Sequence, residues 1–133
     1  MILQDDHRCY GCGKDNPKGL KLQFKRDPNG HLLSETVFSK EHQGYKDIVH
    51  GGMIATVLDE VMGNLTWLNG IACMTTQLTV RYKKAIRVGE RVFLEGKIDS
   101  EEGRVIRASA TAKNAQGETF SSASASYLKI KPR

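Results

Sequence analysis

The spacing of apolar residues predicts one long helix in this chain. From Gly51 to about Leu68, apolar residues recur every three or four positions, which is typical of a helix that buries one face. The apolar stripe consists of Ile54, Val57, Leu58, Val61, Leu65 and Leu68. The pair Asn69-Gly70 follows directly and predicts the end of the helix.

Most of the remaining chain alternates apolar and polar residues, as strands do. The segments "LKLQFKRD" and "HLLSETVF" flank the turn "PNG", which predicts a first hairpin. After the helix, four further strands are predicted in "TTQLTVRYKKA", "RVFLEGKID", "RVIRASATAKN" and "TFSSASASYLKIK". Strict alternation in the first of these places Leu78, Val80 and Tyr82 on one face and Thr75 and Gln77 on the other.

Short turns between the strands predict an antiparallel sheet, with the helix packed on its inner face. The fold class is therefore α+β, in a single domain over residues 1–133 with a turn-rich segment over residues 1–20. Many Ala and Ser residues in the last two strands leave room for the helix to approach closely.

The composition is that of an ordinary globular domain, with 39% hydrophobic and 26% charged residues among 133. The start "MILQDDHRCY" lacks the basic end and apolar run of a signal peptide. No apolar run reaches the roughly 18 residues of a membrane span. We therefore expect a cytoplasmic protein without a membrane partner.

The net charge of +5 is unevenly spread, because residues 31–80 are acidic and residues 81–133 are strongly basic. The basic part favours a phosphate-bearing partner, although solvated strand faces explain it equally well. Neither a helix-turn-helix spacing nor an aromatic-rich RNA-binding stretch is found, so nucleic acid is not an expected partner.

Two of the three cysteines form "CYGC" near the start. His7, Cys9 and Cys12 could supply three zinc ligands, but no second cysteine or histidine pair completes a site. A redox pair normally opens a helix, whereas "GKDNPKGL" reads as a turn. We expect structural thiols and no metal, and a zinc site remains the main alternative.

Two adjacent acids, Asp59 and Glu60, lie within the predicted helix and point about 100° apart. Glu60 lies on a polar face and is interpreted as a solvated surface acid. Asp59 lies on a face of small residues, although Asp is a mediocre helix former in a helix interior. Asp59 is therefore a candidate functional residue.

The helix begins with Gly51 and Gly52, each of which costs up to about 1 kcal/mol of helix stability relative to Ala. The first N–H groups of a helix lack intrahelical partners and attract negative charge. The N–H of Gly52 is thus suited to polarising a carbonyl group. Asp59 lies about 10 Å farther along the helix, so both groups meet at one atom only if two chains share the site.

The segment "HGGMIATVLDE" resembles the signature of hotdog-fold acyl-CoA thioesterases, in the branch similar to phenylacetate-pathway thioesterases. The matching positions are His50, Gly51, Gly52 and Asp59. The segments "CYGCGKDNPKGLKLQF" and "EHQGYKDIVHGG" also resemble segments of uncharacterised relatives. The resemblance implies an antiparallel sheet wrapped around one long central helix, homodimers with shared active sites, and often homotetramers.

The resemblance also implies roles for individual residues in the hydrolysis of acyl-CoA thioesters without a cofactor. Gly52 would bind the thioester carbonyl, and Asp59 of the partner chain would act as general base or as nucleophile. Thr75 matches a strand residue that positions water in relatives. Gln43 lies next to Gly44, where one group of relatives has an Asn, and would orient water or the leaving thiol.

The phosphates of coenzyme A would suit the basic segment that follows the helix. The residues expected to contact them are Arg81, Lys83 and Lys84. The alternative function is a protein of the same fold that binds or senses acyl-CoA without hydrolysing it.

Overall fold

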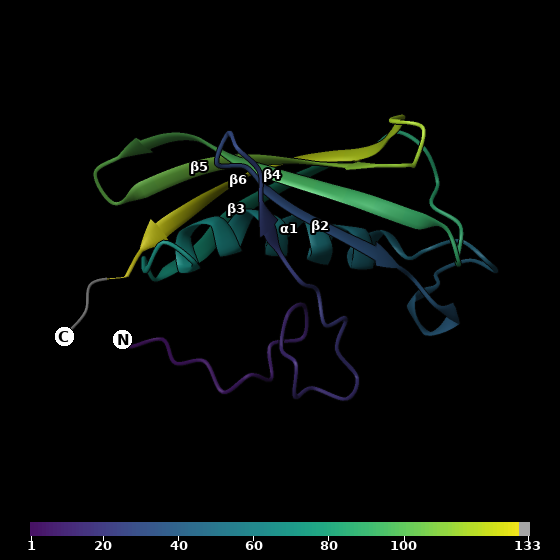
Figure 1. Ribbon diagram of the computed structural model, residues 1–133, viewed down its shortest axis with the longest axis horizontal. Coiled ribbons are helices and arrows are strands. Elements are labelled where there is room, and N and C mark those ends of the chain that lie inside the picture. The colour runs from purple at the N-terminus through teal and green to yellow at the C-terminus, as the bar shows by residue number, and fades with distance from the viewer. Residues whose placement is uncertain (131–133) are drawn as a thin grey trace.

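The computed structural model describes residues 1–130 and contains one long helix, α1, which spans Gly51–Trp67. The sheet curves over one side of α1, and the N-terminal segment lies on the opposite side (Figure 1). The other elements are β1 (Lys25–Arg26), β2 (Leu32–Val37), η1 (Lys40–His42), β3 (Cys73–Tyr82), β4 (Arg91–Glu102), β5 (Val105–Lys113) and β6 (Thr119–Lys129). The predicted α+β fold class is confirmed.

The sheet has six strands in the order β1-β2-β4-β5-β6-β3, and every neighbouring pair is antiparallel. Tight turns join β4 to β5 and β5 to β6, whereas α1 connects β2 to β3 at the far edge. The predicted first hairpin is confirmed, but β1 contains only two residues. Within residues 1–130, the ten-residue β3 is therefore the long edge strand of the sheet.

The predicted apolar stripe of α1 packs against the inner face of the sheet. Its buried members are Ile54, Val57, Leu58, Val61 and Leu65. Leu68, expected to belong to the stripe, is 53% exposed because the helix ends at Trp67. Gly70 then adopts a positive φ of 78°, in agreement with the predicted stop at Asn69-Gly70.

Small residues let the helix and the sheet approach closely, as the sequence predicts. A Cβ atom on Gly96 of β4 would lie 2.8 Å from the carbonyl oxygen of Val61, so only glycine fits where α1 crosses this strand. Buried alanines line the neighbouring strands β5 and β6: Ala108, Ala110, Ala112, Ala123 and Ala125.

The regular pairing of β3 with β6 is interrupted between Thr75 and Gln77. Thr75 pairs with Tyr127, and Gln77 pairs with Ser126, so Thr76 is the extra residue of a bulge. The alternation of side chains therefore shifts by one residue at this point. Thr75 turns toward α1, which differs from the strict alternation expected from the sequence.

The N-terminal segment has no regular secondary structure before β1 and is held by backbone hydrogen bonds. The amide of Gly13 donates to the carbonyl of Cys9 over 2.8 Å, and the amide of Leu22 donates to Gly11 over 2.9 Å. The turn-rich character expected for residues 1–20 is thus observed. Within residues 1–130, no helix is long and apolar enough to cross a membrane.

Candidate active site

The carboxylate of Asp59 is held by two hydroxyl groups from neighbouring strands. The phenol of Tyr127 on β6 donates to Oδ1 over 2.7 Å. The hydroxyl of Thr75 on β3 lies 3.1 Å from Oδ1 and 3.4 Å from Oδ2. Oδ1 therefore accepts the shorter hydrogen bonds from both hydroxyls, and Oδ2 is the freer oxygen of the carboxylate.

Tyr127 was not anticipated from the sequence as a site residue. It is buried, and its hydroxyl also lies 3.2 Å from the backbone carbonyl of Asp59. Burial first, and the nearby negative charge of Asp59 second, raise the pKa of the Tyr127 phenol far above its usual range. The phenol thus stays neutral and serves as a hydrogen-bond donor. Its only sequence signal is that it is the one large residue at an inward position of "SASASY".

Thr75, which the resemblance singled out, is brought to Asp59 by the bulge in β3. Thr75 and Tyr127 face each other across the β3–β6 pairing. Both hydroxyls consequently converge on one carboxylate, which the sequence pattern alone did not predict. The arrangement can orient the carboxylate and limit its rotation.

Asp59 borders a cavity of about 290 Å³ between α1, β3 and the N-terminal segment. The cavity mixes acidic groups, thiols and apolar side chains. Its lining residues include Asp59, Glu60, Trp67, Cys73, Cys9 and Leu3. Met62 of α1 is fully buried in the core and does not line this cavity.

Glu60 is half-buried, so its interpretation as a solvated surface acid is wrong. The thiol of Cys9 donates to Oε1 over 3.3 Å, and the amide of Asn64 donates to Oε2 over 3.0 Å. A Cβ atom on Gly11 would lie 2.2 Å from Cγ of Glu60, so the N-terminal loop touches the helix here. Burial first, and the Glu60 charge second, raise the pKa of the Cys12 thiol above its usual range.

The N-terminus of α1 is capped by His50. Its Nδ1 atom accepts a hydrogen bond from the N–H of Gly52 over 2.8 Å. The N–H group predicted to bind a carbonyl therefore already has a partner in this conformation. A Cβ atom on Gly51 would lie 3.4 Å from the Tyr82 ring, whose hydroxyl donates to the Gly51 carbonyl over 2.8 Å.

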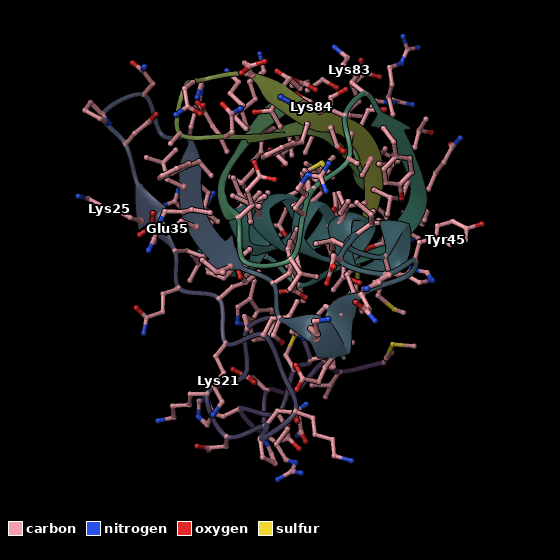
Figure 2. All side chains as sticks on the ribbon, turned by 90° about the vertical axis from the view of Figure 1, so that its right-hand side faces the viewer. Lys21, Lys25, Glu35, Tyr45, Lys83 and Lys84 are labelled. Atoms are coloured by element: carbon pink, nitrogen blue, oxygen red, sulfur yellow. The ribbon has the colours of Figure 1, made fainter. Side chains whose placement is uncertain are left out.

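The bond between Tyr82 and Gly51 places the predicted phosphate-binding residues near the helix N-terminus, because they flank Tyr82 in the chain. Arg81, Lys83 and Lys84 are all exposed. Figure 2 shows Lys83 and Lys84 close to each other at the top of the view. Lys84 Nζ lies 3.5 Å from a carboxylate oxygen of Glu118, so the positive charge of Lys84 is partly balanced by this ion pair.

Gln43 lies in the loop before α1 and pairs with Val49 in an isolated bridge. Its side-chain oxygen accepts the N–H of Asp47 over 3.0 Å. The structure thus places Gln43 near the helix N-terminus, on the same side as His50, and not beside the Asp59 carboxylate of its own chain.

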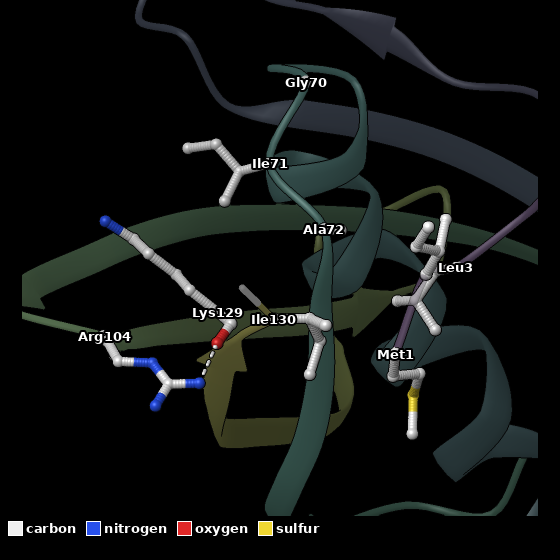
Figure 3. Close-up of a pocket in the computed structure, with 9 residues that line it drawn as sticks. Met1, Leu3, Gly70, Ile71, Ala72, Arg104, Lys129 and Ile130 are labelled. Atoms are coloured by element: carbon white, nitrogen blue, oxygen red, sulfur yellow. Dashed lines mark hydrogen bonds between the residues drawn. The ribbon is translucent and has the colours of Figure 1, made fainter. Parts of the chain in front are cut away.

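A second cavity, of about 510 Å³, lies beyond the C-terminal end of α1 and is mostly apolar (Figure 3). Its lining residues include Met1, Ile2, Leu3, Ile71, Ala72 and Ile130. Among residues 1–130, its charged lining residues are Arg104 and Lys129, and no carboxylate side chain or thiol lines it. Leu3 lines both this cavity and the one beside Asp59.

The antiparallel sheet wrapped around a central helix, with an acid on that helix beside a cavity, is the arrangement of a hotdog-fold protein. The model of the Thioesterase superfamily matches residues 46–121, which include α1 and all of β3, β4 and β5. The chain belongs to the thioesterase superfamily.

The chain is similar in sequence to acyl-coenzyme A thioesterases. THEM4 of Mus musculus is 34% identical over 91 residues, which cover 68% of this chain and 39% of that protein. THEM5 of Mus musculus is 24% identical, over 91% of this chain and 61% of that protein. The chain thus spans about two fifths of the length of the THEM4 relatives that it matches.

Solved structures show the same fold. A thioesterase superfamily protein superposes with a TM-score of 0.85 at 27% identity, over 92% of this chain and 63% of that chain. A hypothetical thioesterase from Streptococcus pneumoniae TIGR4, solved with coenzyme A, has a TM-score of 0.76 at 19% identity, over 84% and 88% of the two chains.

Proposed function

We propose that this protein hydrolyses acyl-CoA thioesters and that Asp59 carries the reaction. The observation behind the proposal is the Asp59 carboxylate, fixed by Tyr127 and Thr75 at the wall of a cavity. The related THEM4 proteins are acyl-coenzyme A thioesterases, and a protein of similar fold from Streptococcus pneumoniae binds coenzyme A. Membership of the thioesterase superfamily supports the same class of reaction.

The freer oxygen of Asp59, Oδ2, is the reacting atom in this proposal. As a general base, it takes a proton from water while the water attacks the thioester carbonyl. As a nucleophile, it attacks the carbonyl itself, and water then cleaves the acyl-enzyme anhydride. Both routes use the same carboxylate and release the thiol of coenzyme A.

The carbonyl oxygen is polarised by the N–H of Gly52 in the partner chain. Gly52 and Asp59 of one helix are about 10 Å apart, too far to act on one carbonyl group. The exposed edge of β3, which runs the length of the sheet, offers a surface on which two copies can pair. A homodimer formed there brings the helices of two chains side by side.

Binding of the carbonyl requires the His50 ring to release the Gly52 N–H, since that bond is formed in the isolated chain. Gly51 keeps the approach to the N-terminus free of a side chain. Gln43, whose oxygen is already bonded to Asp47, presents its amide N–H groups to water or to the leaving thiol.

The phosphates of coenzyme A lie against Arg81, Lys83 and Lys84 in this proposal. Their position follows from the Tyr82–Gly51 bond, which brings this basic segment to the helix end that binds the thioester. Arg81 and Lys83 are more available than Lys84, because Lys84 already has Glu118 as a partner. A homotetramer, a cytoplasmic location and the absence of membrane and nucleic-acid partners stay predictions.

Release of free thiol from short, long and aromatic acyl-CoAs tests the proposal, with the unmodified protein and an Asp59→Asn variant compared. We expect turnover by the unmodified protein on at least one acyl class and its loss in the variant. Full turnover by a folded Asp59→Asn protein would remove Asp59 from the reaction.

One observation favours a second candidate, a protein that binds acyl-CoA without hydrolysing it. The bond between Gly52 and His50 occupies the donor that the oxyanion needs. This candidate predicts saturable binding of acyl-CoA in a calorimetric titration together with no thiol release. Hydrolysis of any acyl-CoA that depends on Asp59 excludes it.

A further inference from the structure

Three side chains that the proposed hydrolysis does not use gather beside the cavity. They are Cys9 and Cys12 of the N-terminal loop and Glu60 of α1. The two Sγ atoms and a carboxylate oxygen all lie within 4.8 Å of one another. We propose that these three residues bind a zinc ion that fastens the N-terminal segment to the central helix.

The donor set suits zinc. Two thiolates and one carboxylate are ligands that Zn²⁺ accepts in tetrahedral sites, with Zn–S near 2.3 Å and Zn–O near 2.1 Å. Ligand atoms in such a site lie about 3.5–3.8 Å apart. The cluster therefore needs to contract by about 1 Å or less, and water completes the fourth position.

The loop is built for a close approach to Glu60. Gly11 has no room for a Cβ atom beside Glu60, and a Cβ atom on Gly13 would lie 2.4 Å from the amide nitrogen of Cys9. Gly13 is thus required by the tight turn that carries the two thiols, and Gly11 lets this turn lie directly against the Glu60 side chain. The turn brings together residues 51 positions apart in the chain.

The charge of the cluster is also uncompensated. Glu60 is half-buried and accepts only the Cys9 thiol and the Asn64 amide, and it forms no ion pair within residues 1–130. Binding of a divalent cation places a positive charge directly beside the Glu60 carboxylate and releases the two thiol protons to solvent, so the net charge of the cluster does not change.

The zinc ligands differ from those considered from the sequence. The ring of His7 is exposed and lies 3.6 Å from the carboxylate of Asp5, and His7 is not part of the cluster. Glu60, distant in sequence, takes its place. The sequence could not indicate this ligand, because nothing in the spacing of "CYGC" connects it to the helix.

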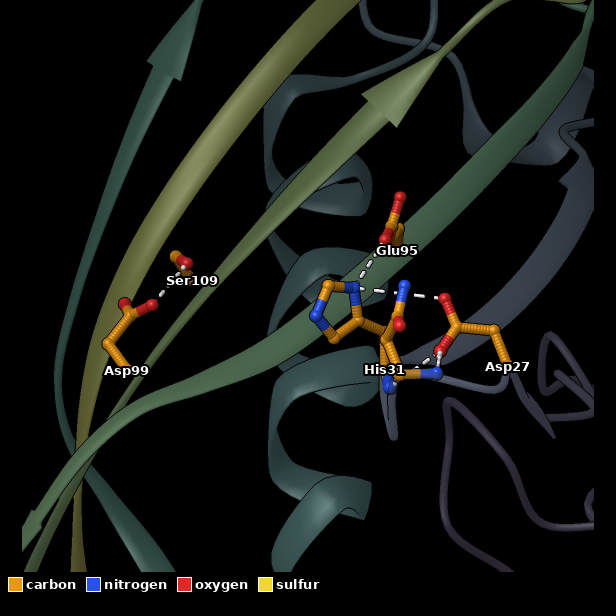
Figure 4. Close-up of polar contacts among 6 residues, drawn as sticks. Asp27, His31, Glu95, Asp99 and Ser109 are labelled. Carbon is orange, nitrogen blue, oxygen red and sulfur yellow. Dashed lines mark hydrogen bonds and ion pairs between the residues drawn. The ribbon is translucent and has the colours of Figure 1, made fainter.

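A second group, Asp27, His31 and Glu95, also holds three possible ligand atoms (Figure 4). Its members are already bonded to one another or to the backbone. His31 Nδ1 lies 2.6 Å from Glu95, and the Asp27 carboxylate accepts the N–H groups of Asn29 and His31 at 2.9 Å each. Asp27 and His31 belong to the turn between β1 and β2, and Glu95 belongs to β4. This group serves as the internal comparison for the test.

The test measures zinc per chain in the full-length protein after dialysis against dilute zinc, for the unmodified protein and for Cys9→Ser, Cys12→Ser and Cys73→Ser variants. We expect one zinc per chain in the unmodified protein and in Cys73→Ser, whose thiol lies in the same cavity but outside the cluster. Cys9→Ser and Cys12→Ser should lose it. Absence of zinc from the unmodified protein would overturn the proposal. Zinc retained by both Cys9→Ser and Cys12→Ser would also overturn it, and would indicate that Asp27, His31 and Glu95 bind the ion instead.

Alkylation of the unmodified protein gives a readout that needs no variant to fold. Zinc should slow the alkylation of Cys9 and Cys12 at least tenfold, as located by peptide mass analysis, and leave Cys73 unchanged. Equal rates with and without zinc would contradict the site. Neither measurement depends on thioester hydrolysis, so the zinc site and the proposed function can fail separately.

Discussion

Asp59 and Glu60 are neighbours in the chain, yet their surroundings differ completely. Asp59 faces the sheet, where Tyr127 and Thr75 hold its carboxylate and leave one oxygen freer. Glu60 faces the N-terminal loop, and its two carboxylate oxygens accept from Cys9 of that loop and from Asn64 of α1 itself. A rotation of about 100° around the helix axis thus separates an acid suited to catalysis from an acid suited to holding the N-terminal loop on the helix. The pair provides matched controls for each other.

The largest expected effect is on turnover and separates the two acids directly. Asp59→Asn should lower kcat for acyl-CoA hydrolysis by about 10²–10⁴-fold, because the amide cannot take a proton or attack the carbonyl. Glu60→Gln should keep turnover within about tenfold of the unmodified protein, since its oxygens contact the loop. Kinetics of thiol release measure both, and similar losses in the two variants would show that the acids do not divide the roles.

A second prediction concerns the hydroxyl that orients Asp59. Tyr127→Phe removes the 2.7 Å hydrogen bond to Oδ1 and leaves the ring in place. We expect kcat to fall by about tenfold with little change in KM, because the carboxylate loses its orientation while binding is unaffected. The free energy of unfolding should fall by about 1.5–3 kcal/mol, as for a lost bond to a charged group. An unchanged kcat would mean that Tyr127 has only a structural role.

A third prediction tests the contact between the loop and Glu60. Gly11→Ala puts a Cβ atom 2.2 Å from Cγ of Glu60, so the carboxylate must move away from Cys9 and Asn64. We expect the free energy of unfolding to fall by about 1–3 kcal/mol.

Gly63→Ala, on α1, is the matched control for that substitution. Its Cβ atom would meet only the Tyr127 ring, at 3.7 Å, so helix propensity should raise stability by up to about 1 kcal/mol. Chemical denaturation measures both variants. Equal changes in the free energy of unfolding, in the same direction, would show that the N-terminal loop does not contact Glu60 closely.

The smallest expected effect is a decrease in the free energy of unfolding at alkaline pH. The raised pKa of Tyr127 means that the folded protein keeps this proton after the unfolded chain has lost it. The stability contributed by the buried phenol is complete below pH of about 10, the ordinary pKa of tyrosine, and declines as pH rises above it. An absorbance titration should therefore show that Tyr127 ionises only as the protein unfolds. Ionisation of Tyr127 while the protein is still folded would contradict this account.

The sequence predicts the helix, its end and the antiparallel sheet because each leaves a periodic signal. Asp59 was identified because it departs from that signal on a face of small residues. Tyr127 and the environment of Glu60 were missed because both depend on contacts between segments more than 50 residues apart. Alternation also places Thr75 on the wrong face, since a one-residue bulge gives no clear mark in composition.

The shared site is the central claim, and two inactive variants can test it. Gly52→Pro removes the N–H donor at a helix position where proline is tolerated, and Asp59→Asn removes the reacting oxygen. A heterodimer of the two variants contains one site in which Gly52 of one chain meets Asp59 of the other. Circular dichroism of each variant first establishes that α1 is retained.

The decisive measurement is thiol release by the purified heterodimer, with each inactive homodimer as a control. The account predicts that the heterodimer recovers about half of the turnover of the unmodified dimer, because one of its two sites is intact. A heterodimer as inactive as its parents would contradict the account and place Gly52 and Asp59 in separate roles within a single chain.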